Sequence, residues 1–292
     1  MNQFGAQNMV SQIKKVLLEK PHKNMSKVDY KKWNYHGPLD QKLINSNYDE
    51  FLNILKISDI EIIYLDSNNT NEELCDSIFT HDPSLIINNG SIILNMSKEL
   101  RKDEINKHIN LYKKLNIPII GRIINEGRVE GGDCLWLNDN IILVGISSRT
   151  NIHGINQLKD ILIKFNISVI PIKLPNNSKI DSCFHLMSII SMLDYDLVIG
   201  YKKFISDELE NILKKNNIKL IEIPEDEYLD SKTLAVNILA LSPRNLVMLN
   251  GYNKTSELLY KENCKLHLFN GNELCIKAEG GPTCLTRPIL RI

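Results

Sequence analysis

"KKLNIPIIGRI", residues 113–123, is one of five versions of a phrase that recurs along the chain. Each version has a basic stretch, usually an asparagine, and then a run of residues typical of β-strands. The other four are "KISDIEIIYL" (56–65), "KFNISVIPIKL" (164–174), "KKNNIKLIEIP" (214–224) and "KENCKLHLF" (261–269). The strand-like runs begin near Ile60, Ile117, Ile167, Ile218 and Cys264, at spacings of 57, 50, 51 and 46 residues. Five such units account for the chain of 292 residues.

The segments in front of these runs share a pattern. An amphipathic helical stretch precedes four of the five runs, and two apolar runs joined by turn residues precede each helix. The turns are "NNG" from Asn88, "NDN" from Asn138, "DYD" from Asp194 and "SPRN" from Ser242. Each unit is therefore predicted to fold as a hairpin, a helix and a third strand.

The fifth unit is split between the two ends of the chain. The segments "SQIKKVLLEK" (11–20) and "TCLTRPILRI" (283–292) each supply one strand, so we expect a closed ring that pins the C-terminal tail. The alternative is an ordinary doubly wound α/β sheet, which also alternates strands and helices. The phosphate-binding patterns GxGxxG and GxxxxGK[ST] do not occur in the sequence. The sequence therefore favours an α/β ring of five modules.

Bulk composition limits the classes of function. A hydrophobic content of 43% and a charged content of 24% are typical of a globular protein, and 35 basic residues balance 35 acidic ones. This balance argues against a nucleic-acid or acidic-membrane partner. No apolar run approaches the roughly 20 residues of a membrane span, and residues 1–15 lack the pattern of a signal peptide. We therefore expect a cytoplasmic protein.

The cysteines are spread through the chain without CxxC spacing, which indicates neither a disulfide framework nor a zinc knuckle. Most are expected to be small buried hydrophobic residues. The six are Cys75, Cys134, Cys183, Cys264, Cys275 and Cys284.

Unusual polar residues fall at or near the predicted hairpin starts, which a ring brings together around its axis. They are Asp82 in "DSIFTHDPSL", Glu130 and Asp133 in "EGGDCL", His185 in "CFHLMS" and Cys284 in "GGPTCLT". A thiol, an imidazole and a carboxylate suffice for covalent catalysis, and the further carboxylates would bind a cation. Each residue also has a structural interpretation, as a packed cysteine, a histidine at the end of a buried strand, or acids in solvated turns. Their joint position in the repeat favours the catalytic interpretation.

Together these motifs resemble the guanidino-group-modifying enzymes of the pentein fold, most closely the dimethylarginine dimethylaminohydrolase-like branch. The resemblance covers nearly the whole chain through "DSIFTHDPS", "VEGGDCLWL", "VGISSRTN", "FHLMS" and "GGPTCLTRP", in the order of the family. It implies a five-bladed ββαβ propeller, with residues 1–292 as a single catalytic domain. This agrees with the ring that the repeat predicts.

The resemblance also implies roles for individual residues. Cys284 is similar to the family's nucleophile and His185 to its general acid and base, while Glu130 resembles the carboxylate that orients the histidine. Asp82 resembles the aspartate that grips the guanidinium nitrogens, and Asp133 is near enough to assist.

Two arginines resemble clamps for a substrate α-carboxylate. Arg149 in "SSRTN" has the stronger likeness, and Arg101 in "KELRKDE" is a second candidate. The implied chemistry needs no metal and no organic cofactor.

The sequence departs from its relatives at two positions that bear on the substrate. His81 precedes Asp82, where arginine deiminases have arginine and dimethylarginine hydrolases often have glutamate. Met187 stands where arginine deiminases have a second substrate-binding aspartate. An apolar group there does not pair with an unsubstituted guanidinium nitrogen. This pattern resembles that of dimethylarginine hydrolases and puts simple deimination of arginine in doubt.

We therefore predict a cysteine-dependent hydrolase of a guanidino compound, in which a thiouronium intermediate gives a ureido product of the citrulline type and an amine or ammonia. An arginine derivative is the expected partner. An amidinotransferase or a deiminase of arginine or agmatine would use the same residues. A non-catalytic binding protein is a further alternative, since a ribosome-binding translation factor has the same fold. The exact substrate and a homo-oligomeric state stay open.

Overall fold

The computed structural model describes residues 3–65, 74–175 and 184–292. It contains five three-stranded sheets. In each sheet the middle strand pairs antiparallel with the first strand and parallel with the third, and a helix connects the middle strand to the third. The predicted order of hairpin, helix and strand is confirmed.

Four modules are continuous in sequence. The first comprises β3 (Ser84–Ile87), β4 (Gly90–Ile93), α3 (Glu104–Lys114) and β5 (Ile119–Arg122), and the second β6 (Cys134–Asn138), β7 (Ile141–Ile146), α4 (Ile152–Leu162) and β8 (Ser168–Lys173). The third comprises β9 (Ile190–Asp194), β10 (Leu197–Gly200), α5 (Asp207–Lys215) and β11 (Lys219–Glu222). The fourth comprises β12 (Leu239–Ser242), β13 (Asn245–Leu249), α7 (Asn253–Lys261) and β14 (Lys265–Phe269). Two short helices lie outside the repeat, α1 (Tyr30–Trp33) and α6 (Glu225–Asp230).

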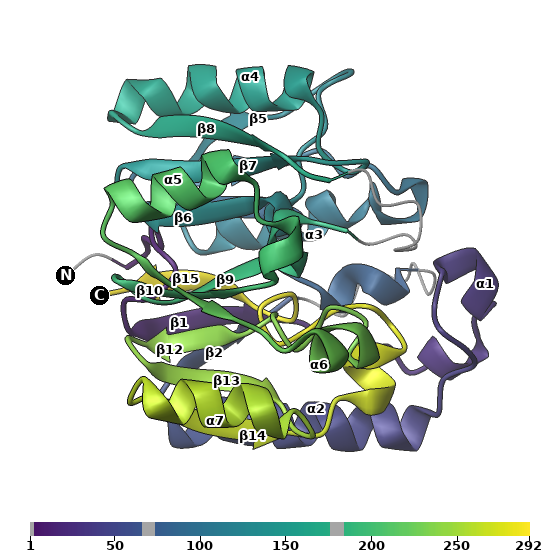
Figure 1. The fold of residues 1–292 in the computed structure, drawn as a ribbon. Helices are drawn as coiled ribbons and strands as arrows, with labels where there is room; N and C mark the ends of the chain where they lie inside the picture. The colour runs from purple at the N-terminus through teal and green to yellow at the C-terminus, as the bar shows by residue number, and fades with distance from the viewer. Residues whose placement is uncertain (1–2, 66–73, 176–183) are drawn as a thin grey trace.

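The fifth module joins the two ends of the chain. Its strands are β15 (Arg287–Arg291), β1 (Ile13–Leu18) and β2 (Glu61–Tyr64), and α2 (Gln41–Ile57) connects β1 to β2. β1 pairs antiparallel with β15, from Ile13 opposite Arg291 to Leu17 opposite Arg287, and the two strands lie side by side in Figure 1. This pairing anchors the C-terminal tail, as the split repeat predicts.

The recurring phrase marks the end of each module's helix. Its asparagine, or Asp59 in the first copy, has a left-handed backbone with φ between 54° and 59°. The next residue donates its backbone N–H to the carbonyl five residues back, for example Ile117 to Tyr112 (2.9 Å) and Ile218 to Leu213 (2.9 Å). This is the Schellman arrangement, which satisfies otherwise unpaired carbonyls and turns the chain into the third strand.

The first and middle strands of every sheet are mostly buried, and the third strand lies toward the solvent. We call the first strand of each sheet its inner strand. Neighbouring sheets touch through these inner strands, because β15 contacts β3, β6 contacts β9, and β9 contacts β12. Arg291 of β15 also donates to the carbonyl of Ala240 in β12 (3.0 Å). In Figure 1, α4 lies at one edge of the molecule, and α2 and α7 lie at the opposite edge. The fold is thus the α/β ring that the sequence predicts, and the alternative prediction of a doubly wound sheet is wrong.

Four cysteines, Cys75, Cys134, Cys264 and Cys275, are buried, as expected. Cys284 is partly exposed, and Cys183 lies outside the described residues. Within the described ranges, no helix combines the length and apolar character that crossing a membrane requires.

Candidate active site

The segments in front of the five inner strands meet at one end of the ring. Asp82 precedes β3, Glu130 precedes β6, His185 precedes β9, and Cys284 precedes β15, each by two to five residues. The corresponding segment before β12 carries Asn237. The ring therefore brings together polar groups that lie far apart in the sequence.

Two cavities meet at Cys284. The wide lobe has a volume of about 420 Å³, and Met187, Tyr228, Leu229, Leu234 and Asn237 are among its lining residues. The narrow lobe has a volume of about 20 Å³ and is lined by Trp33, Asp76, Phe79, Asp82, Lys98, Arg101, Arg149 and Ala278. His185, Glu279 and Cys284 line both lobes. A ligand that reached both lobes would therefore lie against Cys284 and His185.

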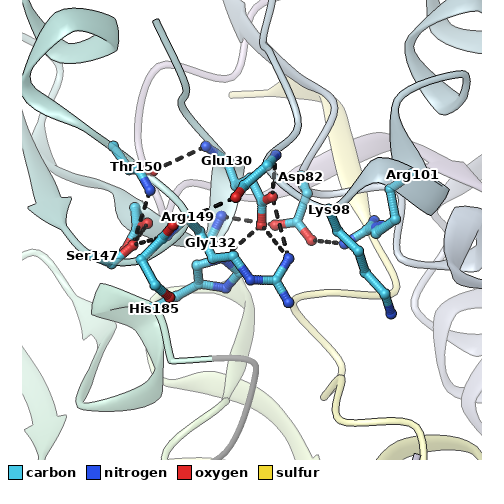
Figure 2. A network of polar contacts seen from close by, with 12 residues as sticks. Asp82, Lys98, Arg101, Glu130, Gly132, Ser147, Arg149, Thr150 and His185 are labelled. Atoms are coloured by element: carbon cyan, nitrogen blue, oxygen red, sulfur yellow. Dashed lines mark hydrogen bonds and ion pairs between the residues drawn. The ribbon is translucent and has the colours of Figure 1, made fainter. Parts of the chain in front are cut away.

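His185 is held by a buried carboxylate. Its Nε2 lies 2.9 Å from Oε2 of Glu130, and because a carboxylate only accepts, Nε2 carries the hydrogen. Glu130 also accepts from the backbone N–H of Ser97 (2.8 Å) and from Arg149 (3.3 Å) (Figure 2). Burial by itself would raise the pKa of Glu130, but the hydrogen bond from His185 and the charge of Arg149 outweigh it and lower the pKa. Glu130 is therefore an anion that fixes the orientation of the imidazole.

Gly132 allows this arrangement. A Cβ atom at this position would lie 2.4 Å from Nδ1 of His185, so any side chain would displace the ring. The backbone N–H of Gly132 donates to Oδ1 of Asp82 (2.9 Å). The glycine therefore links the imidazole to the aspartate of the neighbouring sheet.

Asp82 lies in the narrow lobe with a strong cationic partner. Its Oδ2 accepts from Nη1 of Arg101 at 2.7 Å. Burial opposes ionisation of this carboxyl, but the charges of Arg101 and His185 outweigh burial and hold its pKa below the usual range. Each carboxylate oxygen has a second lone pair, so Asp82 can accept from a further donor.

Arg101, which we predicted as a second clamp for a substrate carboxylate, already uses most of its N–H donors in hydrogen bonds within the protein. Its Nε and Nη2 each lie 2.9 Å from an oxygen of Glu104, and Nη2 also donates to the backbone carbonyls of Asp76 and Phe79. A two-bond clamp on a substrate carboxylate would need some of these bonds to break. This geometry fits a residue that fixes Asp82.

Asp133, which we predicted to assist in binding substrate, is not among the described residues that line either lobe. It is fully buried, and its oxygens accept from the hydroxyl of Ser147 (2.6 Å) and the backbone N–H of Leu186 (2.9 Å). Burial raises the pKa of this carboxyl. Because Leu186 follows His185 directly, Asp133 holds the backbone beside the imidazole.

The remaining charges of the narrow lobe lie around Lys98. Its ammonium group is 2.6 Å from Oδ2 of Asp76 and 2.7 Å from the carbonyl oxygen of Trp33. Tyr35 donates to the other oxygen of Asp76 (2.7 Å). Arg149 lines the same lobe, as its predicted contact with substrate requires.

Cys284 sits on a turn held at both ends. Its backbone carbonyl accepts from the N–H of His81 (3.2 Å), and the N–H of Leu285 donates to the carbonyl of Gly281 (3.1 Å). Nδ2 of Asn237 lies 3.3 Å from Sγ. Sequence reasoning missed Asn237, although its position before the fourth inner strand of the repeat could have revealed it.

Comparison with known proteins gives the family. The family model described as arginine deiminase matches residues 66–210 and 202–291. The chain belongs to the arginine deiminase family. The uncharacterized protein YkgA of Bacillus subtilis (strain 168) is 26% identical over 282 residues, which are 96% of this chain and 92% of YkgA. An arginine deiminase of Clostridium perfringens is 26% identical over 79% of this chain, which spans only 66% of that enzyme's length.

The fold resembles that of DDAH from Pseudomonas aeruginosa, whose structure was solved as a mutant complexed with citrulline. The TM-score is 0.77 at 22% identity, with 94% of this chain and 99% of DDAH covered. The sequence motifs and these matches together show that this member of the arginine deiminase family has the pentein fold of the guanidino-modifying superfamily.

The two positions at which this family member departs from its relatives differ in location. Met187 is almost fully buried and lines the wide lobe. His81 instead lines a separate cavity of about 10 Å³, and its Nδ1 donates to the carbonyl of Thr286 (2.9 Å). Burial and the charge of Arg287 lower the pKa of His81 to about 3, so its ring is neutral. Of the two, only Met187 lines a lobe that also contains Cys284 and His185.

Proposed function

We propose that this protein is a cysteine-dependent hydrolase of a guanidino compound, similar in activity to dimethylarginine dimethylaminohydrolase. One observation carries the proposal: Cys284 and His185 line both lobes, and the carboxylate of Glu130 accepts a hydrogen bond from Nε2 of His185. A nucleophile, a proton-transfer group and an orienting carboxylate around one cavity form the set that covalent catalysis needs. A binding protein would have no use for this combination.

In the proposed reaction, the thiolate of Cys284 attacks the central carbon of the substrate guanidinium. A C–S bond forms, and the electron pair of the C=N bond moves to nitrogen to give a tetrahedral adduct. His185 then gives a proton to the departing nitrogen, the C–N bond breaks, and an amine or ammonia leaves. A thiouronium group remains on Cys284.

The second half of the reaction uses the same residues. His185, now neutral, takes a proton from water while the water oxygen attacks the thiouronium carbon. The C–S bond breaks, the thiolate of Cys284 is restored, and a ureido product leaves once the added hydroxyl has given its remaining proton to solvent. Glu130 stabilises the imidazolium in both halves because its charge lies 2.9 Å from Nε2.

The narrow lobe fits the charged part of the substrate. Asp82 is an anion with open lone pairs, so a substrate guanidinium can share it with Arg101. Arg149, in the same lobe, is the residue we assign to a substrate carboxylate. We assign Arg101 the role of holding Asp82 in place, because most of its N–H donors are already used within the protein.

The wide lobe fits a substituent on the departing nitrogen. Met187, Leu229 and Leu234 give it apolar walls beside Cys284. Burying methyl groups there gains about 0.8 kcal/mol per carbon, whereas a buried N–H without an acceptor costs about 1–3 kcal/mol. We therefore propose an N-substituted guanidine, such as an N-methylated arginine, as the preferred substrate.

An amidinotransferase is the second candidate, and the size of the wide lobe favours it. A cavity of about 420 Å³ that reaches both Cys284 and His185 has room for an acceptor amine in place of water. The amine would lose a proton to His185 as it attacks the same thiouronium carbon, the C–S bond would break to restore the thiolate of Cys284, and a new guanidine would leave. Both reactions use the same catalytic residues.

We also propose that residues 1–292 act as one catalytic unit. The groups assigned to the reaction come from four of the five modules, since Asp82, Glu130, His185 and Cys284 precede β3, β6, β9 and β15. A fragment of the ring would lack part of this set.

The experiment that tests the function is a panel of arginine, N-methylated arginines, agmatine and guanidino acids, with and without an added amine. The expected result is a ureido product without added amine and fastest turnover of an N-methylated arginine. A new guanidine formed only when an amine is present would identify a transferase. No turnover of any guanidine by the folded protein would contradict both.

A further inference from the structure

Asn237 occupies the place in its module that the catalytic candidates occupy in theirs. It lies two residues before the inner strand β12, as Asp82 lies two residues before β3. Its side chain is 3% exposed and lines the wide lobe, with Nδ2 3.3 Å from Sγ of Cys284. The repeat thus delivers a fifth polar group to the site.

The orientation of this amide is fixed by its other end. The backbone N–H of Thr283 donates to Oδ1 of Asn237 at 3.0 Å. A backbone N–H only donates, so the amide oxygen faces Thr283 and the NH₂ group faces the sulfur. The hydroxyl of Thr283 also donates to the carbonyl of Ile238 (3.1 Å), which ties the two loops together.

Gly281 shows how closely the turn packs on this side chain. A Cβ atom on Gly281 would lie 2.5 Å from Oδ1 of Asn237. The glycine therefore lets the loop of the nucleophile approach the amide, and the amide has little freedom to turn away.

We propose that Asn237 is a hydrogen-bond donor that stabilises the thiolate form of Cys284. The inference rests on the proposed role of Cys284 as the nucleophile. A donor is held more strongly by an anionic sulfur than by a neutral one, so its presence favours ionisation. Cys134 provides a contrast, because its thiol donates to the carbonyl of Glu130 (3.7 Å) and a carbonyl acceptor favours the protonated form.

The test measures alkylation of Cys284 by iodoacetamide as a function of pH, with the labelled peptide quantified by mass spectrometry. Asn237→Asp keeps the oxygen that accepts from Thr283 and replaces only the donor that faces the sulfur. Asn237→Ala removes the donor without adding charge. In both variants we expect the midpoint of the alkylation profile to rise by about one pH unit or more, with about tenfold slower labelling at neutral pH.

Two controls separate the donor from other effects. Asn245→Asp makes the same chemical change at a distant residue that contacts His267, and its profile should match the wild type. Met187→Asp adds a negative charge in the wide lobe while keeping Asn237, so its shift measures charge alone. Thermal unfolding confirms that each variant is folded.

An unchanged midpoint in folded Asn237→Ala overturns the proposal. If Asn237→Ala does not fold, a shift in Asn237→Asp no larger than that in Met187→Asp overturns it instead. Alkylation needs no guanidino substrate, so this result is independent of the substrate panel. A shift in both Asn237 variants with no turnover of any guanidine would leave the donor in place and reject the proposed function.

Discussion

The two lobes that meet at Cys284 differ in size and in the share of charged side chains in their walls. The narrow lobe has about 20 Å³ of space and contains the ionisable side chains of Asp76, Asp82, Lys98, Arg101 and Arg149. The wide lobe has about 420 Å³, and its walls next to Cys284 and His185 include apolar side chains.

The two kinds of wall would select a ligand by different physical means. Buried charges are stable only when they are paired, and pairing fixes their positions, as the 2.7 Å contact between Asp82 and Arg101 illustrates. The narrow lobe is therefore rigid and specific for charge. The wide lobe selects by size and by loss of water, which discriminates less sharply between similar groups.

The largest effect is expected where the lobes meet. Cys284→Ser should lower kcat at least about 10³-fold, because an alcohol is a far weaker nucleophile than a thiolate at neutral pH. Mass spectrometry of the wild type should trap a substrate-derived adduct on Cys284. Cys264→Ala, a change at a buried cysteine that lines neither lobe, should keep activity. Full activity of the serine variant would end the covalent mechanism.

The next effect concerns the imidazole that lines both lobes. His185→Ala should lower kcat by about 10²–10⁴-fold and slow both release of the amine and hydrolysis of the intermediate. Glu130→Gln should cost less, because orientation and charge are weakened but both reacting groups remain. Single-turnover kinetics separate the two half-reactions. If Glu130→Gln were the more impaired variant, Glu130 would belong to substrate binding.

A smaller effect is expected from placing a carboxylate at the apolar position 187 of the wide lobe. Met187→Asp supplies an acceptor for N–H groups, so preference should shift from dimethylarginine toward arginine by about tenfold or more in the ratio of kcat/KM values. Met187→Leu is the matched control and should keep the wild-type preference. A wild-type preference for plain arginine would show that Met187 does not read the nitrogen substituent.

The smallest effect is on stability and depends on pH. The pKa of Glu130 is lowered in the folded protein, so its contribution is complete above the ordinary value of 4.5 and is lost as pH falls through the folded value. The difference in free energy of unfolding between the wild type and Glu130→Gln should therefore shrink as pH falls below about 4.5. Urea unfolding at several pH values measures it. A difference that stays constant would mean that the pKa of Glu130 does not change on folding.

Several features of the site were predictable from the sequence, and their neighbours show where such prediction ends. Glu130 and Asp133 share one short motif, yet Glu130 faces His185 while Asp133 bonds Ser147 and Leu186. His81 and Asp82 are adjacent, yet only Asp82 lines a lobe at Cys284. Side-chain direction within a tight turn depends on partners from other modules, so residue type and spacing do not settle it.

Arg101 and Asn237 illustrate the same limit in opposite directions. The sequence makes Arg101 a candidate for contact with substrate, but Glu104, three residues on, takes two of its donors. Asn237 has no motif around it; its place before the fourth inner strand hints at the site, and its 3.3 Å contact with Sγ of Cys284 shows that it belongs there. Both depend on which groups the ring brings within hydrogen-bonding distance.

By itself, the sequence determined the five modules and their order. The signal is local, because an asparagine with positive φ ends a helix through bonds that span about six residues, and short runs of apolar residues between turn residues set the strands. Only the tertiary structure decided the shape of the two lobes, the hydrogen-bond partners of Asp133 and the placement of the Asn237 amide beside the thiol. These depend on contacts between modules that are 46 to 205 residues apart, such as Thr283 with Asn237 and His81 with Thr286, and long-range pairing leaves no periodic trace in the sequence.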